Sequence, residues 1–308
     1  MIQEIVKDLT RKHEVSKELK KQAKLNIQAM ARRDERLMRC LYAPEGHTYV
    51  SCDLASGEPT VITHFSQDKN YADATLNMVG QLPYYENDVL KIGSLYLMVA
   101  SVSPVGRDKM REFYNTKFGG VPFPEAYLAN PDIVKDAEPA FYALHKVLTL
   151  GLGYSMGPRK LVTSAYDAGH IIPFKIAKEF YAQYWSLFGD VQKLAKLLEA
   201  KYNRDKYLVN PFGYRLKPDK PYKALNYFIQ SSVSGIMHIL CAKFFAICPW
   251  ATFITIIHDE LIMLCPNERL AEAREGMKRA EESLNADLKW RVRVRVGWAE
   301  GKDMYEAK

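Results

Sequence analysis

The sequence lacks several patterns that identify common classes of protein. Its five cysteines (Cys40, Cys52, Cys241, Cys248 and Cys265) form no Cys-x-x-Cys pair and no Cys/His group with zinc spacing. Their odd number favours reduced thiols in the cytosol. The N-terminus has no charged-then-apolar leader pattern, and no apolar run approaches membrane-spanning length. We therefore expect a soluble, cytoplasmic protein without membrane contact.

Internal repeats, low-complexity tracts and phosphate-binding loops are also lacking. The spacing of Gly151, Gly153 and Gly157 matches neither the dinucleotide fingerprint nor a P-loop. The chain does have 308 residues, of which 48% are hydrophobic, enough for one large domain or two intertwined domains. Its formal net charge is +7. Lys and Arg are in excess over residues 1–39, where apolar positions between 5 and 27 predict amphipathic helices with a basic face. Such a face is either a solvated surface or a contact for phosphates.

Two apolar halves surround a polar triplet near the C-terminus. Residues 253–257 are mostly β-branched, residues 261–264 are apolar, and His258, Asp259 and Glu260 lie between them. This pattern predicts a β-hairpin with His258 and Asp259 near its turn. A buried carboxylate is costly unless a cation compensates it, so the triplet is either a site for a divalent metal or a solvated polar turn.

A second carboxylate segment occurs about two hundred residues earlier. Residues 48–53 alternate as in a strand that ends at Asp53, Glu58 follows, and His-Phe-Ser-Gln-Asp occupies residues 64–68. This segment resembles the first catalytic motif of the family A DNA polymerases, the group of bacterial DNA polymerase I and phage replicative polymerases. The triplet at 258–260 resembles the last catalytic motif of that family.

The resemblance implies an α+β fold: a right-hand polymerase core with an antiparallel palm sheet, a mainly helical fingers subdomain and a thumb that is reduced or absent. We expect a basic helical N-terminal segment at 1–44, the first part of the palm at 45–84, fingers at 85–216 and the second part of the palm at 217–308. Local patterns predict a long helix at 176–201, a turn at 210–213, a helix at 221–247, a hairpin at 252–264, a helix at 267–287, and a strand at 290–296 that exposes a row of arginines.

The resemblance also implies a site for two Mg²⁺ ions. Asp53 and Asp259 would be the carboxylate ligands, and the backbone carbonyl of Leu54 would be a third. Two such ions activate the primer 3′-hydroxyl and stabilise the transferred phosphoryl group. Glu260 is expected to support this catalytic group, and His258 either orients the turn or contacts the primer end.

Lys146, Leu150 and Tyr154 lie four residues apart, so a helix would align them on one face. An ordinary packed helix has the same pattern. In the family this helix belongs to the fingers, where the Lys contacts the triphosphate and the Tyr abuts the new base pair. The family has an Arg where this chain has Tyr142, and His145 or Arg159 is a candidate for the missing charge. The usual Phe or Tyr is Leu150, and the usual Gly after the fingers Tyr is Ser155.

Further residues match family positions that contact the sugar and the DNA. Glu58 would fill the space beside C2′ and exclude a 2′-hydroxyl, which favours deoxynucleotides. Asn226 and Gln230 resemble the pair that contacts the minor groove next to the primer terminus. Lys223 lies next to Tyr222, which stands where an Arg is common.

The sequence therefore predicts a magnesium-dependent nucleotidyltransferase of DNA replication that extends a primer on a DNA template with dNTPs. Because only 52 residues precede Asp53, the chain is either a piece of a split polymerase, with a separate chain that carries the thumb or an exonuclease, or it holds duplex by another route. The alternatives are an RNA-synthesising or gap-filling variant and a DNA-binding subunit with weak or no activity without a partner. A similar strand and tail end the family's chains, so we expect this C-terminus to be complete.

Overall fold

The computed structural model describes residues 38–307. The amphipathic helices predicted between residues 5 and 27 lie outside the described residues. Within the described part, the chain forms two compact units. The first contains residues 38–53, 244–279 and 296–307, and the second contains residues 54–243 and 280–295. The predicted palm and fingers boundaries stay predictions.

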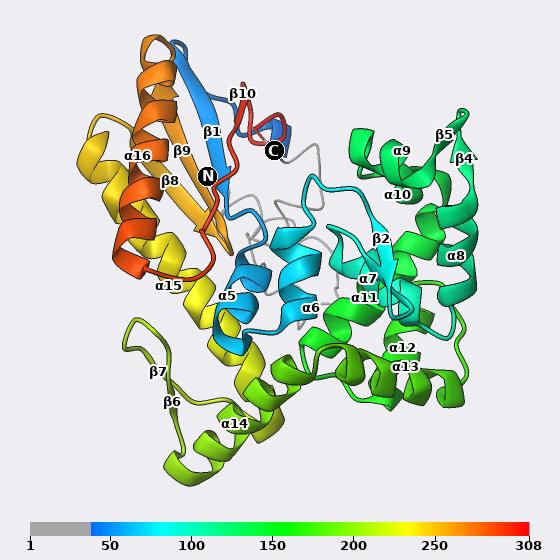
Figure 1. The fold of residues 1–308 in the computed structure, drawn as a ribbon. Coiled ribbons are helices and arrows are strands. Elements are labelled where there is room, and N and C mark those ends of the chain that lie inside the picture. Colours follow the sequence, from blue (N-terminus) through cyan, green and yellow to red (C-terminus); the bar gives the residue numbers. More distant parts are fainter. Residues whose placement is uncertain (1–37, 308) are drawn as a thin grey trace, which may run out of the picture. The chain divides into compact units, whose positions relative to one another are not determined.

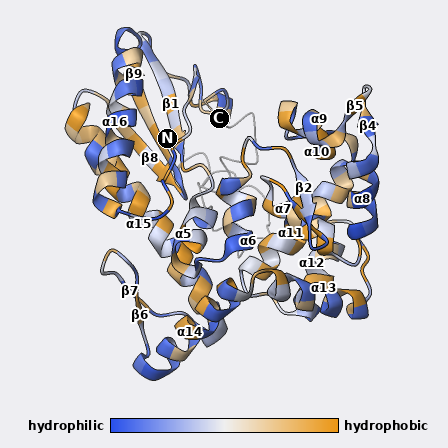
Figure 2. Ribbon diagram, viewed as in Figure 1, coloured by the Kyte–Doolittle hydropathy of each residue, from blue (hydrophilic) through white to orange (hydrophobic). Residues whose placement is uncertain are grey.

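The first unit is built on a four-stranded sheet with the order β10-β1-β9-β8 (Figure 1). Its strands are β1 (His47–Asp53), β8 (Thr252–Ile257), β9 (Glu260–Pro266) and β10 (Ala299–Gly301). Every pairing in the sheet is antiparallel. The strands β8 and β9 form the hairpin predicted at 252–264, and they are mainly apolar in Figure 2. The hairpin prediction is confirmed.

Successive side chains of a strand point to opposite faces of a sheet. Both faces of this sheet carry buried residues. On one face, Val50, Cys52, Met263 and Cys265 are fully buried. On the other face, β-strand residues form a cluster with residues from both ends of the described chain: Met38, Ala43, Tyr49, Ile257, Ile262, Leu264, Met304 and Ala307. Met38 and Ala43, before β1, and Met304 and Ala307, after β10, thereby cover this face of the sheet.

Two helices run from one unit into the other along the chain. The helix α15 (Ala224–Ile247) follows the short 3₁₀ turn η2 (Pro221–Lys223), and α16 (Leu270–Leu288) follows η3 (Asn267–Arg269). They confirm the helices predicted at 221–247 and 267–287. Within the first unit, a Cβ added at Gly276 would collide with Cys248 Sγ, so α16 lies tightly against the end of α15.

The segment Pro221–Ile247 is also long and apolar enough to cross a membrane, with a mean hydropathy of 1.3 over its most apolar window. The expectation that no segment reaches this length is wrong by that measure. Half of the window is buried within the protein, as in the core helix of a soluble protein, so this helix is weak evidence for a membrane span.

The second unit is mainly helical. Its helices are α5 (Gly57–Ser66), α6 (Lys69–Ala72), the π-helical turn η1 (Asp73–Asn77), α7 (Leu95–Val102), α8 (Arg107–Asn115), α9 (Phe123–Ala129), α10 (Ile133–Ala137), α11 (Pro139–Gly153), α12 (Pro158–Asp167), α13 (Phe174–Leu187) and α14 (Gly189–Asp205). Three two-stranded ribbons accompany them: β2 (Tyr84–Glu86) with β3 (Val89–Lys91), β4 (Lys117–Phe118) with β5 (Val121–Pro122), and β6 (Leu208–Val209) with β7 (Arg215–Leu216). The α+β class is confirmed.

The turn predicted at 210–213 connects β6 and β7. The side-chain oxygen of Asn210 accepts hydrogen bonds from the backbone N–H groups of Phe212 (3.0 Å) and Tyr214 (2.9 Å). Gly213 has a φ of 84°, a left-handed conformation that costs glycine little. The Asn-Pro-Phe-Gly sequence therefore forms the expected turn for the expected reason.

The prediction of a single continuous helix at 176–201 is wrong. The structure has two helices, α13 and α14, with a break at Phe188, where φ is −115° and ψ is 57°. The side chain of Asp68 accepts a hydrogen bond from the backbone N–H of Asp190 (3.0 Å), in the first turn of α14. This contact stabilises the new helix start, and it comes from a residue more than a hundred positions earlier.

The strand predicted at 290–296 is also wrong. The segment is irregular, and the last strand of the sheet is β10, at Ala299–Gly301. The predicted alternation of burial is nevertheless present: Val292 and Val294 are buried, whereas Arg291, Arg293 and Arg295 are exposed. The sequence pattern thus predicted which side chains are buried and which are exposed. It did not predict what the backbone bonds to.

Candidate active site

The polar triplet lies at the tip of the β8–β9 hairpin. Ile257 and Glu260 are register partners, so His258 and Asp259 form a two-residue loop. His258 has a φ of 57°, as tight hairpin loops require at their first residue, and it is exposed. Such a backbone conformation costs a non-glycine residue roughly 1–3 kcal/mol. His258 shares a positive φ with seven other non-glycine residues of the described part, so the strain by itself does not mark a catalytic position.

Asp53 and the triplet meet at one end of the sheet. Asp53 is the last residue of β1, and its register partner is Glu260, the first residue of β9. Asp259 directly precedes Glu260 and is half-buried, whereas Asp53 is exposed. The antiparallel pairing of β1 with β9 therefore brings together two carboxylate segments that are about two hundred residues apart in the sequence.

Glu260 differs from the two aspartates because it points into the protein. Its side chain is buried, and Ser51 Oγ donates a hydrogen bond to Glu260 Oε1 (2.6 Å). Both residues are on the same face of the sheet, two positions apart in the ladder. This contact favours a supporting role for Glu260. The sequence pattern does not single out Ser51, since nothing local marks it as a partner of a distant carboxylate.

The carboxylates affect a neighbouring thiol. Cys52 directly precedes Asp53 and is fully buried. Burial raises the pKa of Cys52 well above its ordinary value, and Cys265, Asp53 and Glu260 raise it further. The thiol therefore stays protonated and acts as an apolar core residue.

Gly297 lies against the carboxylate of Asp53, and no sequence motif points to it. Its N–H donates a hydrogen bond to the backbone carbonyl of Asp53 (2.8 Å). A Cβ added at Gly297 would collide with Asp53 Oδ1. The backbone of Gly297 is thus part of the surface on which the Asp53 carboxylate rests, and any larger residue there would have to displace it.

The end of β1 and the tip of the hairpin each offer one aspartate carboxylate as a metal ligand. Among residues 38–307, no group of three or more His, Cys, Asp or Glu side chains is arranged to hold a metal. Mg²⁺ is commonly bound through one or two carboxylates together with substrate phosphates and water, so Asp53 and Asp259 would be sufficient. The carbonyl of Leu54 accepts a hydrogen bond from the N–H of Gly57 (3.2 Å), which leaves one lone pair for a further ligand.

In the second unit, two residues predicted for different tasks contact each other. Tyr154 Oη donates a hydrogen bond to Glu58 Oε2 (2.6 Å). Glu58 is in the first turn of α5, and Tyr154 directly follows α11. Tyr71 and Tyr96 lie near the same carboxylate: burial raises the pKa of each hydroxyl, and the charge of Glu58 contributes to the rise. Glu58 is thus bonded to one phenol group and near two others.

The predicted fingers helix is present as α11. It contains Lys146, which is exposed, and Leu150, which is half-buried; Tyr154 caps its C-terminal end. Ser155, which replaces the glycine usual in the family, has a φ of 62°. A glycine would adopt this left-handed conformation without strain, which accounts for the residue usual at that position.

The charge that the family takes from an arginine is not supplied by His145. This side chain is fully buried, and burial lowers its pKa to about 4. Its Nδ1 bonds the carbonyl of Phe141 (2.9 Å), and its Nε2 bonds Ser103 Oγ (3.1 Å). His145 is therefore neutral, and its candidacy is wrong. Arg159, at the start of α12, is exposed and stays the candidate.

The residues predicted to contact DNA lie at the start of α15. Gln230 is exposed, whereas Asn226 is half-buried, and its Oδ1 is buried without a hydrogen-bond partner in the described residues. Lys223 donates a hydrogen bond to Asp219 (2.7 Å), and this bond raises the pKa of Lys223. The positive charge of Lys223 is therefore partly offset by Asp219.

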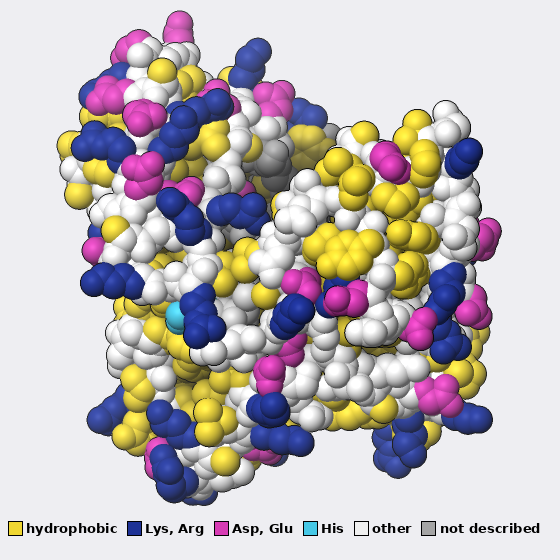
Figure 3. All heavy atoms as spheres, in the orientation of Figure 1, with side chains coloured by type: hydrophobic (Ala, Val, Ile, Leu, Met, Phe, Trp, Pro, Cys, Tyr) yellow, Lys and Arg dark blue, Asp and Glu magenta, His cyan; other side chains and the backbone are white. Residues whose placement is uncertain are grey.

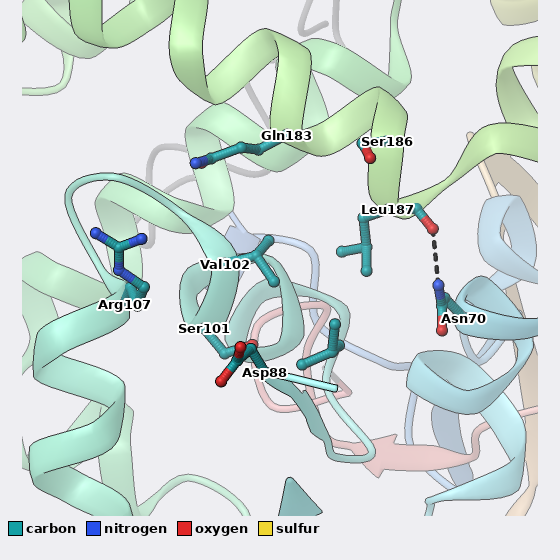
Figure 4. A pocket seen from close by; sticks show the side chains of 9 residues that line it. Asn70, Asp88, Ser101, Val102, Arg107, Gln183, Ser186 and Leu187 are labelled. Atoms are coloured by element: carbon teal, nitrogen blue, oxygen red, sulfur yellow. Dashed lines mark hydrogen bonds between the residues drawn. The ribbon is translucent and has the colours of Figure 1, made fainter. Parts of the chain in front are cut away.

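A cavity of about 300 Å³ in the second unit is separate from all of these residues (Figure 4). Asn70 spans one side of it by donating a hydrogen bond to the carbonyl of Leu187 (2.9 Å). The lining residues are Asn70, Asp88, Val89, Ser101, Val102, Arg107, Gln183, Ser186 and Leu187. None of the predicted site residues belongs to this lining, so the cavity is not the predicted nucleotide site.

Comparison with known proteins confirms the resemblance to the family. The sequence model of DNA polymerase family A matches residues 142–306. Among solved structures, the chain is similar to the polymerase domain of Pol1 from M. smegmatis in complex with DNA primer-template and dNTP, with a TM-score of 0.66 and 19% identity. The match covers 92% of this chain and 45% of that chain. No curated protein matches the sequence.

Proposed function

Because the chain belongs to DNA polymerase family A, we propose that it adds deoxynucleotides to the 3′ end of a primer on a DNA template. The observation that carries this proposal is the register of β1 with β9, with Asp53 opposite Glu260 and next to Asp259. Asp53 is exposed and Asp259 is half-buried, so a primer terminus and a nucleotide can reach these two carboxylates.

Asp53 and Asp259 would hold the catalytic Mg²⁺ ions, with the carbonyl of Leu54 as a further ligand. Bound there, Mg²⁺ would activate the primer 3′-hydroxyl and stabilise negative charge on the transferred phosphoryl group. Glu260, fixed by Ser51, would keep β9 in register with β1. The exposed ring of His258 would contact the primer end.

The second unit would bind the incoming nucleotide. Lys146 is exposed on α11, and its ammonium group would bind the triphosphate. Arg159 would provide a second cation in place of the arginine that Tyr142 replaces. Leu150 and Tyr154 would contact the nascent base pair. A phosphate group is bound well by such cations because charge-assisted hydrogen bonds are the strongest of their kind in proteins.

Glu58 would select the sugar. Its carboxylate is held by the hydroxyl of Tyr154, so it would occupy a fixed position beside C2′ and exclude a ribose. The DNA itself would be contacted by Asn226 and Gln230 in the minor groove, with Lys223 at the backbone. The buried, unpaired Oδ1 of Asn226 is consistent with a partner that is a ligand.

Primer extension by the purified chain tests the proposal. We expect dNTP-dependent extension that Asp53→Asn or Asp259→Asn reduces by several orders of magnitude, because each variant removes a carboxylate charge but keeps the side-chain shape. Glu268→Gln, an exposed carboxylate on η3, is the matched control and should leave extension unchanged. Extension by either aspartate variant at the normal rate would overturn the proposal. Use of rNTPs in place of dNTPs would favour the RNA-synthesising or gap-filling variant.

The second candidate function is a polymerase-like DNA-binding subunit that needs another chain. It is favoured by Tyr142, which stands where the family has an arginine, and by His145, which is neutral and cannot supply that charge. A separate chain with a thumb or an exonuclease would then complete a split polymerase. Extension that begins only when such a partner is added, with DNA binding by the isolated chain, would support this candidate.

A further inference from the structure

Three arginines follow α16 in an alternating segment. Arg291, Arg293 and Arg295, here called the arginine row, are exposed, whereas Val292 and Val294 between them are buried. The arginine row therefore presents three positive charges to solvent on one short segment of the second unit.

The backbone of this segment is fixed without a neighbouring strand. The amide of Asn285 on α16 bonds both backbone groups of Val294: its Oδ1 accepts from the N–H (2.8 Å) and its Nδ2 donates to the carbonyl (2.9 Å). The N–H of Ala55 donates to the carbonyl of Arg295 (2.9 Å). These three bonds do not involve the arginine side chains.

The start of the segment is fixed by aromatic contacts. Trp290 stacks on His64 of α5, with ring centroids 4.6 Å apart and an interplanar angle of 6°. His64 Nδ1 accepts a hydrogen bond from the N–H of Arg291 (3.3 Å). Phe65 contacts Trp290 and also Phe228 of α15, edge to face in both cases. The segment is thus joined to the helix that carries Asn226 and Gln230.

Among the described residues, none of the three arginines of the arginine row has an ion pair. Asp287, at the end of α16, is instead paired with Lys243 (2.6 Å). Figure 3 shows Lys and Arg side chains over the segment that follows α16 and beside a His side chain near α5. Three exposed cations close together in the sequence form a surface that can attract a polyanion.

We propose that the arginine row binds the phosphate backbone of the primer-template duplex. The phosphates of a DNA strand form a regular array of anions, so several arginines exposed on one side of a segment can each contact a phosphate. Phe228 connects the row to α15, which carries the residues proposed to contact the minor groove of the same duplex. This inference rests on the proposed polymerase function, and it assigns a binding role to a segment outside the nucleotide site.

The test compares DNA binding by the wild-type chain and the triple variant R291Q/R293Q/R295Q. Binding of a labelled primer-template is measured by fluorescence anisotropy at several salt concentrations without nucleotide. Each lost phosphate contact lowers the slope of log Kd against log salt by about 0.9, so we expect the slope to fall by about 2.7. Because the backbone bonds do not depend on the arginine side chains, the fold should be kept, which circular dichroism checks.

The control variant is K193Q/K196Q/K201Q on α14. It also removes three positive charges, but from exposed positions outside the arginine row. The proposal expects its salt slope to stay near the wild-type value. A second readout is primer extension at saturating DNA, where the arginine-row variant should keep the wild-type rate per bound complex but release the primer earlier in the presence of a trap.

The outcomes separate this proposal from the polymerase function. An unchanged salt slope in the arginine-row variant, with normal extension by the wild-type chain, would overturn the arginine row and leave the function standing. An equal loss in the α14 control would also overturn it, since net charge alone would then explain the binding. If the wild-type chain neither binds nor extends a primer-template, both proposals are wrong.

Discussion

At the scale of single residues, the position of Asp53 depends on the missing side chain of Gly297. The Asp53 carboxylate occupies the space where a Cβ would be. We therefore predict that Gly297→Ala displaces this carboxylate and lowers the extension rate about a hundredfold, since a displacement of about 1 Å at a reacting group has that order of effect. Single-turnover extension measures the loss, and DNA affinity should stay unchanged.

Two comparisons distinguish a positioning residue from a general structural one. Gly189→Ala, where an added Cβ meets nothing within 4 Å, should be neutral. In the Asp53→Ala background, Gly297→Ala should cause no further loss, because its effect acts through a carboxylate that is already gone. Additive losses in the double variant would contradict the positioning role.

Tyr154 and Glu58 form the second residue-scale prediction. Tyr154→Phe removes the hydroxyl that holds the Glu58 carboxylate. A hydrogen bond to a charged group contributes roughly 1.5–3 kcal/mol, so the preference for dNTP over rNTP in kcat/KM should fall about tenfold. Tyr166→Phe, at an exposed tyrosine of α12, is the control. If Glu58→Ala changed the preference and Tyr154→Phe did not, the hydrogen bond would have no part in sugar selection.

The titratable residues of the site could be inferred from the sequence because their chemistry is unusual beside apolar strands. Ser51 and Gly297 could not. Their partners are Glu260 and Asp53, more than two hundred positions away, and the contacts exist only once the sheet order β10-β1-β9-β8 is fixed. A serine within a strand and a glycine near a C-terminus occur in proteins of every class, so no local signal identifies them.

At the scale of elements, α11 is anchored by a histidine that is kept neutral. The folded chain protonates His145 only near pH 4, whereas the unfolded chain does so near its ordinary pKa of 6.5. The unfolded state therefore binds the extra proton between these values, and the free energy of unfolding falls as the pH drops from 6.5 towards 4. The loss should approach about 3 kcal/mol, at ~1.4 kcal/mol per pKa unit.

Urea unfolding at several pH values measures this loss. Because carboxyl groups also titrate in this range, the informative quantity is the difference between the wild-type chain and His145→Gln, which has no proton to gain. As the pH falls, the wild-type chain should lose more free energy of unfolding than His145→Gln does. Parallel pH profiles for the two chains would mean that His145 titrates normally in the fold.

Local patterns predicted elements well where their boundaries depend on neighbouring residues. The hairpin, the turn at 210–213 and α15 are of this kind. The segment at 290–296 alternates as a strand does, but the amide of Asn285 takes the place of a partner strand. The helix predicted at 176–201 is divided where Asp68 bonds the start of α14. Both differences come from side chains that are distant in the sequence or belong to another element.

At the scale of the whole molecule, bound ligands should raise stability in separable steps. A ligand at a hundred times its Kd stabilises the folded state by about 2.7 kcal/mol. We predict one rise in Tm with a primer-template whose 3′ end is blocked, and a further rise when the matching dNTP and Mg²⁺ are added. Lys146→Ala should keep the first rise and lose the second, because Lys146 is proposed to bind the triphosphate alone.

Differential scanning fluorimetry records both steps, and a mismatched dNTP is the control for the second. A Lys146→Ala chain that loses the DNA step instead would mean that α11 contacts the template strand. The class of fold was accessible from the sequence through two short motifs, yet the arrangement of Glu58 with Tyr154 required coordinates, since 96 positions separate them.

The hydrogen bonds of the Asn285 amide also affect which positions of this protein can change during evolution. It holds the segment at 290–296 through main-chain atoms only, so the exposed positions 291, 293 and 295 can exchange residues without a change of fold. Selection can therefore add or remove positive charge one position at a time, with little effect on Asp53 and the sheet. Chains of this lineage that work at different ionic strengths should differ in the number of arginines there and keep the asparagine.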